Sequence, residues 1–581
     1  MQKPLEESAV KRHNLFVVLS GLIVLSMVLA ACGTPTTVAP VAPTVPPAPP
    51  APELPYEIVP FSEPMVLDAG NCDYGGAVRS VEAVDEFTAV FTLCGPDPAF
   101  LSKMGFSVFG IYPQEWLEWA SQADNVEARL RHPIGSGPYM VDEWTSGESL
   151  TLTANPNFWG DAPHAETLVF RWSTESAART LELQAGTVDG IDNPGPDDFA
   201  VIEGDANLAL IDRPALNTFY IAMTNTFEPW DDVNVRKAIA MGIDRQRIVD
   251  TFYPAGSEVA SHFTPCAIPN GCTGDEWYAF DAAAAKALLA EAGFPDGFAT
   301  KLFYRDVVRG YLPEVPRVAE DIQAQLLENL NINAEIVVME SGAFIEESTA
   351  GRLDGLYLLG WGADYPHVTN FLDFHFGQAN PQFGTPHPEI YEVLVEAAQI
   401  ADPAVAEPLY VEANNAIKEL IPMVPVAHGG SAAAYRADVT TPQASPLTEE
   451  RFALSDPGGR ETFVWMQNAE PISLFCADET DGESLRGCTQ IMESMYAYAA
   501  NDTALEPALA ESCDPNEDLS VWTCHLRQGV TFHDGSPFDA NDVVATFTMG
   551  LDASSPLHQG NTNAWEYYAY LWVSLMNVPP G

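Results

Sequence analysis

Two kinds of apolar periodicity run through the middle of the chain. Residues 233–249 carry apolar side chains at intervals of three and four, which predicts an amphipathic helix pair packed on a core. Farther on, helical segments alternate with short apolar runs, and one helix has Asp281 as its expected N-cap and Gly293 as its stop. This βαβ-like alternation predicts an α/β fold. The segments expected in it are 281–293, 298–304, 317–330, 332–338, 356–361, 388–399, 403–420 and 424–428.

Other segments follow a period of two, which is typical of half-buried strands. Residues 77–84 and 87–93 largely alternate apolar and polar side chains around a short turn, so they predict a hairpin. Residues 462–467 predict a further strand near the end of the chain. Residues 444–460 are polar and contain glycine, which predicts a loop.

The first residues read as a targeting signal. Lys3, Lys11 and Arg12 form a basic start, and the apolar run Leu15–Leu29 is short for a membrane span. Small residues then precede Cys32, as in a bacterial lipoprotein signal. We therefore expect residues 1–31 to be a signal peptide, with lipid attached to Cys32; an uncleaved anchor is the alternative. Residues 32–60 are Pro-rich and predict an extended tether to the membrane surface.

Length and charge narrow the function classes. The chain has 581 residues and 47% hydrophobic content, which suits two or three lobes with large cores. Its 26 Lys+Arg against 81 Asp+Glu give a net charge of −55. Nucleic acid as a partner is excluded on this basis, because its binding needs clustered basic residues. The acidity predicts a strongly solvated surface.

The cysteines predict local disulfides. With Cys32 lipidated, eight of nine remain, an even number that suits an oxidising compartment. They fall into sequence neighbours, and two of the pairs flank predicted hairpins. Zinc is the alternative, but no C-x-x-C pair and no histidine at ligand spacing supports it. The expected pairs are Cys72 with Cys94, Cys266 with Cys272, Cys476 with Cys488, and Cys513 with Cys524.

Several motifs together carry a family resemblance. The last part of the chain contains Glu470-Pro-Ile-Ser-Leu474, then Ala508-Leu-Ala-Glu-Ser512, then Leu526-Arg-Gln-Gly-Val-Thr-Phe-His-Asp-Gly-Ser-Pro-Phe538. Much earlier come Gly135-Ser-Gly-Pro-Tyr139 and Leu150-Thr-Leu-Thr-Ala-Asn-Pro-Asn-Phe-Trp-Gly160. This set resembles the peptide/nickel-type (family 5) extracellular solute-binding proteins of ABC importers. In that family, however, the motifs found here after residue 461 come first.

The resemblance implies an α/β, two-lobed periplasmic-binding-protein-like fold of type II, with an extra small subdomain and a circularly permuted order. A truncated tandem array and a gene-assignment artefact are alternatives, although no segment occurs twice. The order predicts that the strand at 462–467 pairs within the lobe of residues 135–220, and that residues 532–535 pack beside the hairpin at 77–93. The expected parts are the small subdomain (61–134 and 501–581), lobe I (135–225 and 461–500), lobe II (226–435) and a linker (436–460).

The same resemblance implies a binding site. Gly360-Trp-Gly-Ala-Asp-Tyr-Pro366 follows a predicted buried strand and resembles the family segment at the cleft. Carried over, Asp364 would pair with a ligand ammonium, with Trp361 packed beside it and Tyr365 in the same segment. Taken alone, the pattern also fits an aspartate that caps a turn. Asn468, Glu470 and Tyr220 occupy stretches expected to line the cleft from the other lobe.

The ligand stays open at this point. Peptide binders of this family often place an arginine just upstream, but residues 355–359 contain no cation and Arg352 is the nearest. The candidate ligands therefore include longer peptides, oligosaccharides and another cationic solute as well as short peptides. His533 lies in a family turn, so we expect no metal site, and we expect no cofactor. Enzyme signatures such as G-x-S-x-G and H-E-x-x-H do not occur in the sequence.

We therefore expect a monomeric, lipid-anchored extracytoplasmic receptor, not an enzyme. It would close on a small solute, with an oligopeptide as first choice, and deliver it to an ABC permease. The alternatives are a secreted hydrolase of peptides or glycans, and a sensor that reports its ligand without transport.

Overall fold

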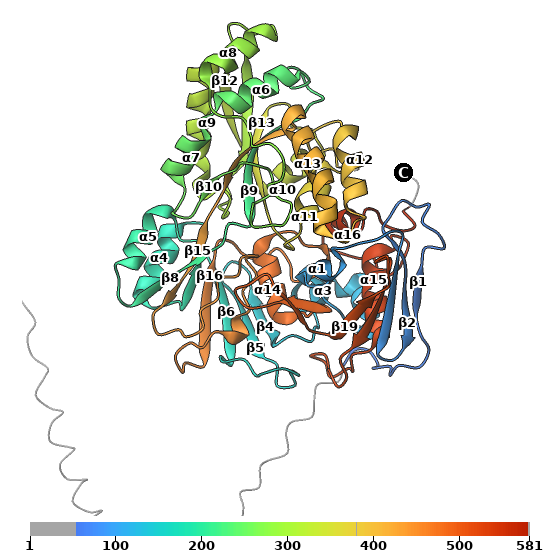
Figure 1. Cartoon of the computed structure of the whole chain (residues 1–581). Coiled ribbons are helices and arrows are strands. Elements are labelled where there is room, and N and C mark those ends of the chain that lie inside the picture. The colour runs from blue at the N-terminus through green and yellow to red at the C-terminus, as the bar shows by residue number, and fades with distance from the viewer. Residues whose placement is uncertain (1–53, 379, 579–581) are drawn as a thin grey trace, which may run out of the picture. The chain divides into compact units, whose positions relative to one another are not determined.

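The computed structural model describes residues 54–378 and 380–578. The predicted signal peptide, Cys32 and most of the predicted tether lie outside these residues. Among the described helices, none is both long enough and apolar enough to cross a membrane. Three large sheets with their helices make up the described chain (Figure 1).

The six-stranded sheet, in the order β10-β14-β9-β13-β11-β12, carries the region that we call lobe II. Its central strand β9 is an apolar run buried on both faces, as expected of a strand covered by helices on two sides. α9 presents a buried stripe at three- and four-residue spacing to the same core. The strands are β9 (Asn217–Met223), β10 (Glu258–Val259), β11 (Ala299–Arg305), β12 (Asn333–Met339), β13 (Leu356–Gly362) and β14 (Met423–His428). The helices are α6 (Val233–Gly242), α7 (Arg245–Phe252), α8 (Ala282–Glu291), α9 (Val315–Leu330), α10 (Ser341–Thr349), α11 (Val368–Phe376), α12 (Pro388–Ala397) and α13 (Pro403–Leu420).

The seven-stranded sheet, in the order β4-β5-β6-β16-β7-β15-β8, carries lobe I. The strands are β4 (Tyr139–Thr145), β5 (Ser149–Ala154), β6 (Thr167–Trp172), β7 (Gly190–Asp192), β8 (Leu208–Arg213), β15 (Ser431–Arg436) and β16 (Thr462–Gln467). The helices are α4 (Ser176–Ala185), α5 (Pro196–Glu203) and α14 (Gly482–Ile491). α4 ends at Gly186, which takes the left-handed conformation that the sequence predicted for a glycine stop.

The five-stranded sheet, in the order β1-β2-β3-β20-β19, carries the small subdomain. β3 alternates buried and half-buried residues, as its sequence predicts. The strands are β1 (Val66–Asp68), β2 (Val78–Asp85), β3 (Thr88–Leu93), β19 (Ala510–Pro515) and β20 (Val521–Leu526), with the separate pair β17 (Tyr496–Tyr498) and β18 (Leu505–Pro507). The helices are α1 (Phe100–Met104), α2 (Gln114–Ala120), α3 (Val126–Arg131), α15 (Ala540–Leu551) and α16 (Glu566–Leu571).

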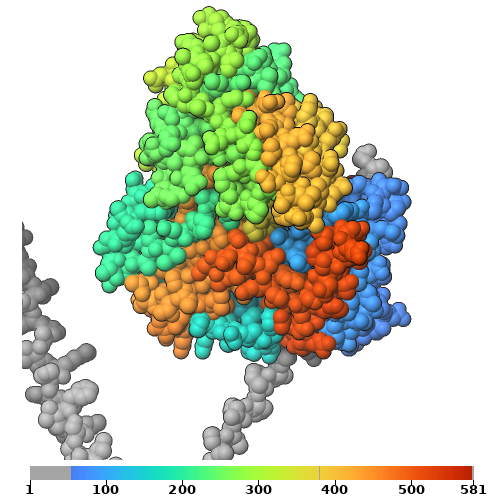
Figure 2. Space-filling model, viewed as in Figure 1, coloured from blue at the N-terminus to red at the C-terminus, as the bar shows by residue number. Residues whose placement is uncertain are grey.

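The end of the described chain completes sheets that begin far earlier in the sequence. β16 lies between β6 and β7 and pairs in parallel with both. β20 pairs with β3, and the backbone N–H of His533 donates to the carbonyl of Gly135 at 2.9 Å. On the face shown in Figure 2, the orange-to-red end of the chain adjoins its blue beginning. The expected pairing of residues 462–467 within the lobe of residues 135–220 is therefore present. The hairpin at 77–93 pairs with residues 521–526, whereas His533 of the 532–535 segment bonds to Gly135, so the expected contact between 532–535 and the hairpin stays a prediction.

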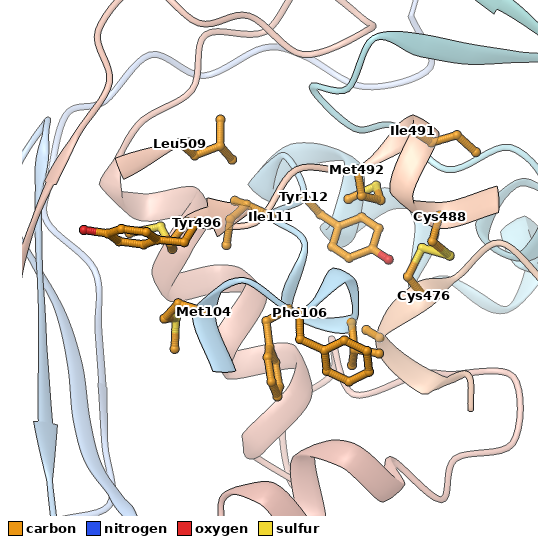
Figure 3. Packing of buried hydrophobic residues seen from close by; sticks show 14 of the residues in the cluster. Met104, Phe106, Ile111, Tyr112, Cys476, Cys488, Ile491, Met492, Tyr496 and Leu509 are labelled. Carbon is orange, nitrogen blue, oxygen red and sulfur yellow. A yellow bond between two sulfur atoms is a disulfide. The ribbon is translucent and has the colours of Figure 1, made fainter. Parts of the chain in front are cut away.

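Buried side chains bind the same two regions together. Residues 104–112 pack against residues 476–509 in one core cluster (Figure 3). The ring of Tyr112 lies beside Met492 and the Cys476–Cys488 disulfide in that view. The last third of the chain is thus part of the core and not an appendage.

The crossings between the lobes lie earlier than the sequence predicted. The chain enters lobe II between Arg213 and Asn217 and returns between His428 and Ser431. β9 and β15 therefore belong to the opposite lobes from those expected with boundaries at 225 and 435. Short apolar strands do not reveal their pairing partners locally, because register and neighbours depend on the other strands of the sheet.

The four predicted disulfides are present: Cys72–Cys94, Cys266–Cys272, Cys476–Cys488 and Cys513–Cys524. Cys513 and Cys524 face each other across the β19–β20 pair, as the predicted hairpin requires. Each bond closes a short loop and restricts the unfolded chain, which stabilises the fold by about 2–3 kcal/mol per bond.

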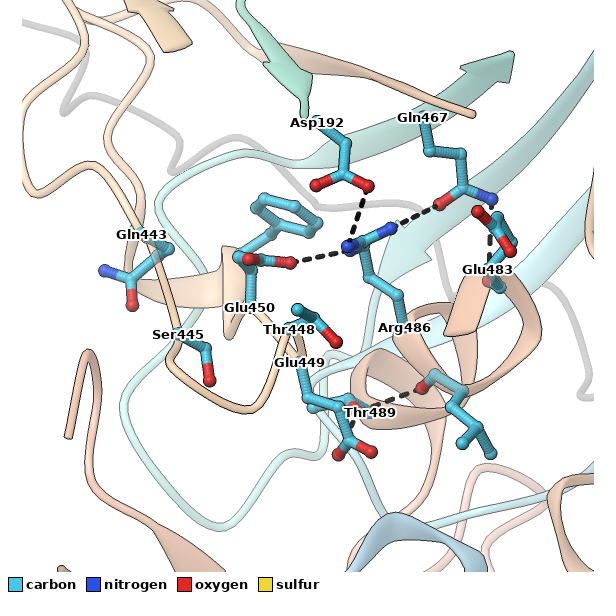
Figure 4. Close-up of polar contacts among 12 residues, drawn as sticks. Asp192, Gln443, Ser445, Thr448, Glu449, Glu450, Gln467, Glu483, Arg486 and Thr489 are labelled. Carbon is cyan, nitrogen blue, oxygen red and sulfur yellow. Dashed lines mark hydrogen bonds and ion pairs between the residues drawn. The ribbon is translucent and has the colours of Figure 1, made fainter. Parts of the chain in front are cut away.

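A buried charge network joins four segments of lobe I. Arg486 pairs with Asp192 at 3.1 Å and with Glu450 at 2.6 Å (Figure 4). Arg213 pairs with the same two carboxylates, with Asp192 at 2.7 Å and with Glu450 at 2.5 Å. All four side chains are at most 2% exposed. Burial alone would raise the pKa of Asp192, but Arg486 and Arg213 outweigh it and hold the pKa at about 2. Through Glu450, the segment 436–460, which was expected as a linker, is tied to this buried network.

Replacing Glu450 tests this network. Glu450→Gln leaves two buried guanidinium groups short of one negative charge, so we expect a loss of about 3–5 kcal/mol in the free energy of unfolding, measured in urea. The neighbouring Glu449→Gln is the control. Glu449 accepts hydrogen bonds only from the hydroxyls of Ser107 and Thr489, so an amide should cost less than about 1 kcal/mol. Equal losses in both variants would contradict the assignment.

Candidate binding site

Two loops of lobe II bring opposite charges to one edge of its sheet. β11 and β13 are parallel neighbours, so their carboxyl ends emerge on the same side. Asp364 follows the end of β13 by two residues, and Arg309 follows the end of β11 by four. The carboxyl ends of parallel strands are a common position for ligand sites in α/β sheets.

Asp364 is held by neutral donors. Its Oδ2 accepts from the side-chain amide of Asn370 at 2.8 Å, and its Oδ1 accepts from the hydroxyl of Tyr567 at 2.8 Å. Asn370 in turn accepts from the Asp364 backbone N–H and from the indole N–H of Trp361. Burial raises the pKa of Asp364 to about 7. The carboxyl group is therefore well oriented, yet no Lys, Arg or His among the described residues forms an ion pair with it.

Trp361 and Tyr365 lie at the contact between the two core clusters. Trp361 stacks on Phe374 with ring centroids 4.2 Å apart, and it packs against both clusters. The Tyr567 ring lies 6.5 Å from it. Tyr365 is almost fully buried and belongs to the cluster shared by lobe I and the small subdomain, although it comes from a lobe II loop. The segment therefore bridges the lobes.

Arg309 is a residue that sequence reasoning missed. Its Nη1 lies 3.1 Å from Oε1 of Glu483, which stands in the first turn of α14 in lobe I. Arg309 also lines a small hollow between the lobes that is partly open to solvent, and Asp364 is not among its lining residues. The lining includes Asn193, Phe199 and Pro254. The available signal was an arginine just past a predicted strand, but pattern alone does not place it in a cleft.

The other predicted site residues lie elsewhere. Glu470 accepts hydrogen bonds from Trp144, Ser146 and Gly147, so it fixes the β4–β5 hairpin turn. Asn468 is buried and donates to Asp192 in the charge network. Tyr220 is fully buried inside lobe II, where its hydroxyl accepts from Gln382, and it lies in the same sheet as Trp361 instead of facing it. Local motifs did not distinguish these structural positions from cleft positions.

Arg352 and His533 occupy structural positions. Arg352 pairs on the surface with Glu346 and Glu347. The ring nitrogens of His533 lie within hydrogen-bond distance of the Gly135 N–H and the Gly137 carbonyl. Within residues 54–378 and 380–578, no group of three or more His, Cys, Asp or Glu side chains is arranged to hold a metal ion.

Comparison with known proteins gives a consistent set of matches. The family described as "Bacterial extracellular solute-binding proteins, family 5 Middle" matches residues 47–383 and 504–566. The Di/tripeptide-binding protein 3 of Pseudomonas aeruginosa is 29% identical over 64% of this chain and 71% of its own length. Heme-binding protein A of Haemophilus influenzae is 29% identical over 60% of this chain and 64% of its own length. The chain thus spans about two thirds of the length of these curated relatives.

A solved structure extends the match to the fold. The ABC transporter-associated periplasmic binding protein DppA from Helicobacter pylori, in complex with peptide STSA, has a TM-score of 0.60 and is 25% identical. The match covers 65% of this chain and 74% of that one.

Proposed function

Because the chain belongs to the bacterial extracellular solute-binding proteins of family 5, we propose that it is a lipid-anchored receptor that binds a short peptide between its lobes and delivers it to an ABC permease. Membership confirms the family resemblance and the expected two-lobed α/β fold. Attachment through Cys32, the permease and the peptide ligand are parts of the proposal. Relatives named as di- or tripeptide-binding proteins support the choice of ligand.

The observation that carries the proposal is the pair of charges at one sheet edge. Asp364 can accept a ligand ammonium, and Arg309 can donate two parallel hydrogen bonds to a carboxylate. A short peptide presents both groups at its two ends. Arg309 thus supplies the cation that the segment before Asp364 lacks. An oligosaccharide carries neither an ammonium nor a carboxylate, so it could form no ion pair with either group.

The ligand assignment is tested by binding measurements. We expect Asp364→Ala and Arg309→Ala each to weaken the binding of unmodified dipeptides by about 10- to 100-fold, as for hydrogen bonds to charged groups. Titration calorimetry over a panel of dipeptides measures the effect. Asp161→Ala and Arg352→Ala are matched controls, because Asp161 is exposed and Arg352 pairs only on the surface. Unchanged affinity in both cleft variants would refute the site.

The affinity should also depend on pH. The ligand-free chain holds a proton on Asp364 up to about pH 7, whereas an ammonium ligand needs the ionised carboxylate. Binding therefore releases this proton at lower pH, and affinity should fall by about tenfold from pH 8 to pH 6. Calorimetry in buffers of different ionisation enthalpy measures the release. An N-acetylated peptide is the control, and a flat profile for the free peptide would contradict this role.

We also propose that the chain is a circularly permuted member of its family. The pairing of β16 with β6 and β7, and of β20 with β3, supports one complete fold in a changed order. The remaining predicted domain boundaries stay part of this proposal.

Reordering the chain tests the proposal. The exposed glycines 458 and 459 offer new ends. The present ends both lie beside α15, since Asn541 accepts from the Met65 N–H and Ala553 donates to the Met576 carbonyl. A chain of residues 459–578, a Gly/Ser linker and residues 61–458 should unfold within a few degrees of the original and bind the same ligands. Failure to fold would oppose the permutation, and a linker variant of the original order controls for the added residues.

A further inference from the structure

Both charges of the candidate site already have partners from across the cleft. Tyr567, on α16 of the small subdomain, donates to Asp364 at 2.8 Å. Glu483, on α14 of lobe I, pairs with Arg309 at 3.1 Å. A hydroxyl donor thus stands where a ligand ammonium would donate, and a carboxylate stands where a ligand carboxylate would accept. These two contacts also join lobe II to the rest of the described chain.

The side chain of Tyr567 is held in place by the residues packed around it. The side chain is 5% exposed, and its ring packs edge-on against Phe106 at 4.8 Å. Next along the helix, Tyr570 meets Phe374 of lobe II at 5.3 Å. The hydroxyl therefore reaches Asp364 from a packed position, and a ligand must move it or open the lobes to replace it.

The side chain of Glu483 is also held in a buried position. The Glu483 side chain is 4% exposed and stands beside the α14 N-cap Asp481, which accepts from the Ser484 N–H. Arg309 lies on the opposite side of the cleft and lines its hollow. An arginine that is engaged by a buried glutamate cannot offer the same nitrogen to a ligand carboxylate.

One segment positions both partners. Residues 476–488 are closed into a loop by the Cys476–Cys488 disulfide, and this loop contains Glu483. In the same loop, Asp478 accepts backbone N–H groups from Thr562, Asn563 and Trp565, directly before α16. The loop therefore supplies Glu483 itself and fixes the approach of Tyr567. We call residues 476–488 together with residues 560–571 the clasp.

We propose that Tyr567 and Glu483 act as internal competitors of the ligand and so determine its class. This inference rests on the proposed binding of short peptides at Asp364 and Arg309. A ligand with a free ammonium displaces Tyr567, and a ligand with a free carboxylate displaces Glu483. Only a ligand with both ends free releases the whole clasp, so the site selects unmodified peptides over blocked ones. The apparent affinity is lowered by the fraction of chains with the clasp closed.

The test uses three probes: the dipeptide alanyl-alanine, its N-acetylated form and its C-terminal amide. Tyr567→Phe keeps the ring and removes the hydroxyl, so it should bind alanyl-alanine and the amide about three- to tenfold more tightly, and the acetylated form no better. Glu483→Gln should bind alanyl-alanine and the acetylated form more tightly than the unaltered chain does, and the amide no more tightly. Calorimetry measures all six combinations.

Matched controls separate competition from general damage. Tyr391→Phe changes a half-buried tyrosine of α12, outside the clasp, and Glu412→Gln removes a charge from an exposed position of α13. Both should leave all three affinities unchanged. Asp478→Asn frees the approach to α16 without touching the cleft charges, and it should repeat the Tyr567→Phe pattern. Circular dichroism and thermal unfolding verify that each variant is folded.

The opposite result is equally clear. If Tyr567 and Glu483 bind the ligand instead of competing with it, their removal weakens binding, and the inference is wrong. The inference is also wrong if either variant gains the same affinity for all three probes, whichever end of the dipeptide is blocked.

A ligand-free measurement distinguishes failure of the inference from failure of the proposed function. The double variant of Tyr567→Phe and Glu483→Gln should show a larger radius of gyration by small-angle X-ray scattering than the unaltered chain. Opening without dipeptide binding in any variant would refute the peptide site and keep the clasp. Dipeptide binding that depends on Asp364, without opening or gain, would keep the site and refute the clasp.

Discussion

The buried network of Asp192, Arg213, Glu450 and Arg486 is the constraint on which the arrangement of lobe I depends. Each member comes from a different stretch of the chain, and each is almost completely removed from water. Buried charges of this kind are tolerated only when every partner is in place, because a lone buried charge is strongly destabilising. The network therefore couples the ends of β7 and β8 to residues 436–460 and to α14, which come together only in the folded chain.

This coupling reaches the cleft through α14. Arg486 lies one helical turn from Glu483, so the same helix that closes the network also presents the partner of Arg309. Asn468, on the stretch between β16 and α14, donates to Asp192. Asn468 was expected to contact the ligand, but it instead belongs to the charge network that holds α14 in place. The position of the cleft charges and the integrity of lobe I have a common physical origin.

The interface between the lobes combines aromatic packing with few polar contacts. The ring of Phe374 stacks on Trp361 and meets Tyr570 of the small subdomain. The hydrogen bond from Tyr567 satisfies the carboxylate of Asp364, which burial would otherwise leave poorly solvated. Buried polar groups are costly without partners, so a cleft that is empty of ligand needs internal ones. This requirement explains why the groups opposite Asp364 and Arg309 are a hydroxyl donor and a carboxylate.

The sequence by itself determined the local features of this protein. Periodicity predicted β16, the β2–β3 hairpin and the helices α6 to α9, α12 and α13, but not α10 and α11. Neighbouring cysteines predicted four disulfides. These features depend on residues close in sequence. The motif at residues 360–366 indicated Trp361 and Asp364. Only the tertiary structure decided the rest. It placed β9 in lobe II and buried Tyr220 there. It directed Glu470 to the β4–β5 turn. It also brought Arg309, Glu483 and Tyr567 to the cleft. These outcomes depend on contacts between residues far apart in the chain, which no local pattern encodes.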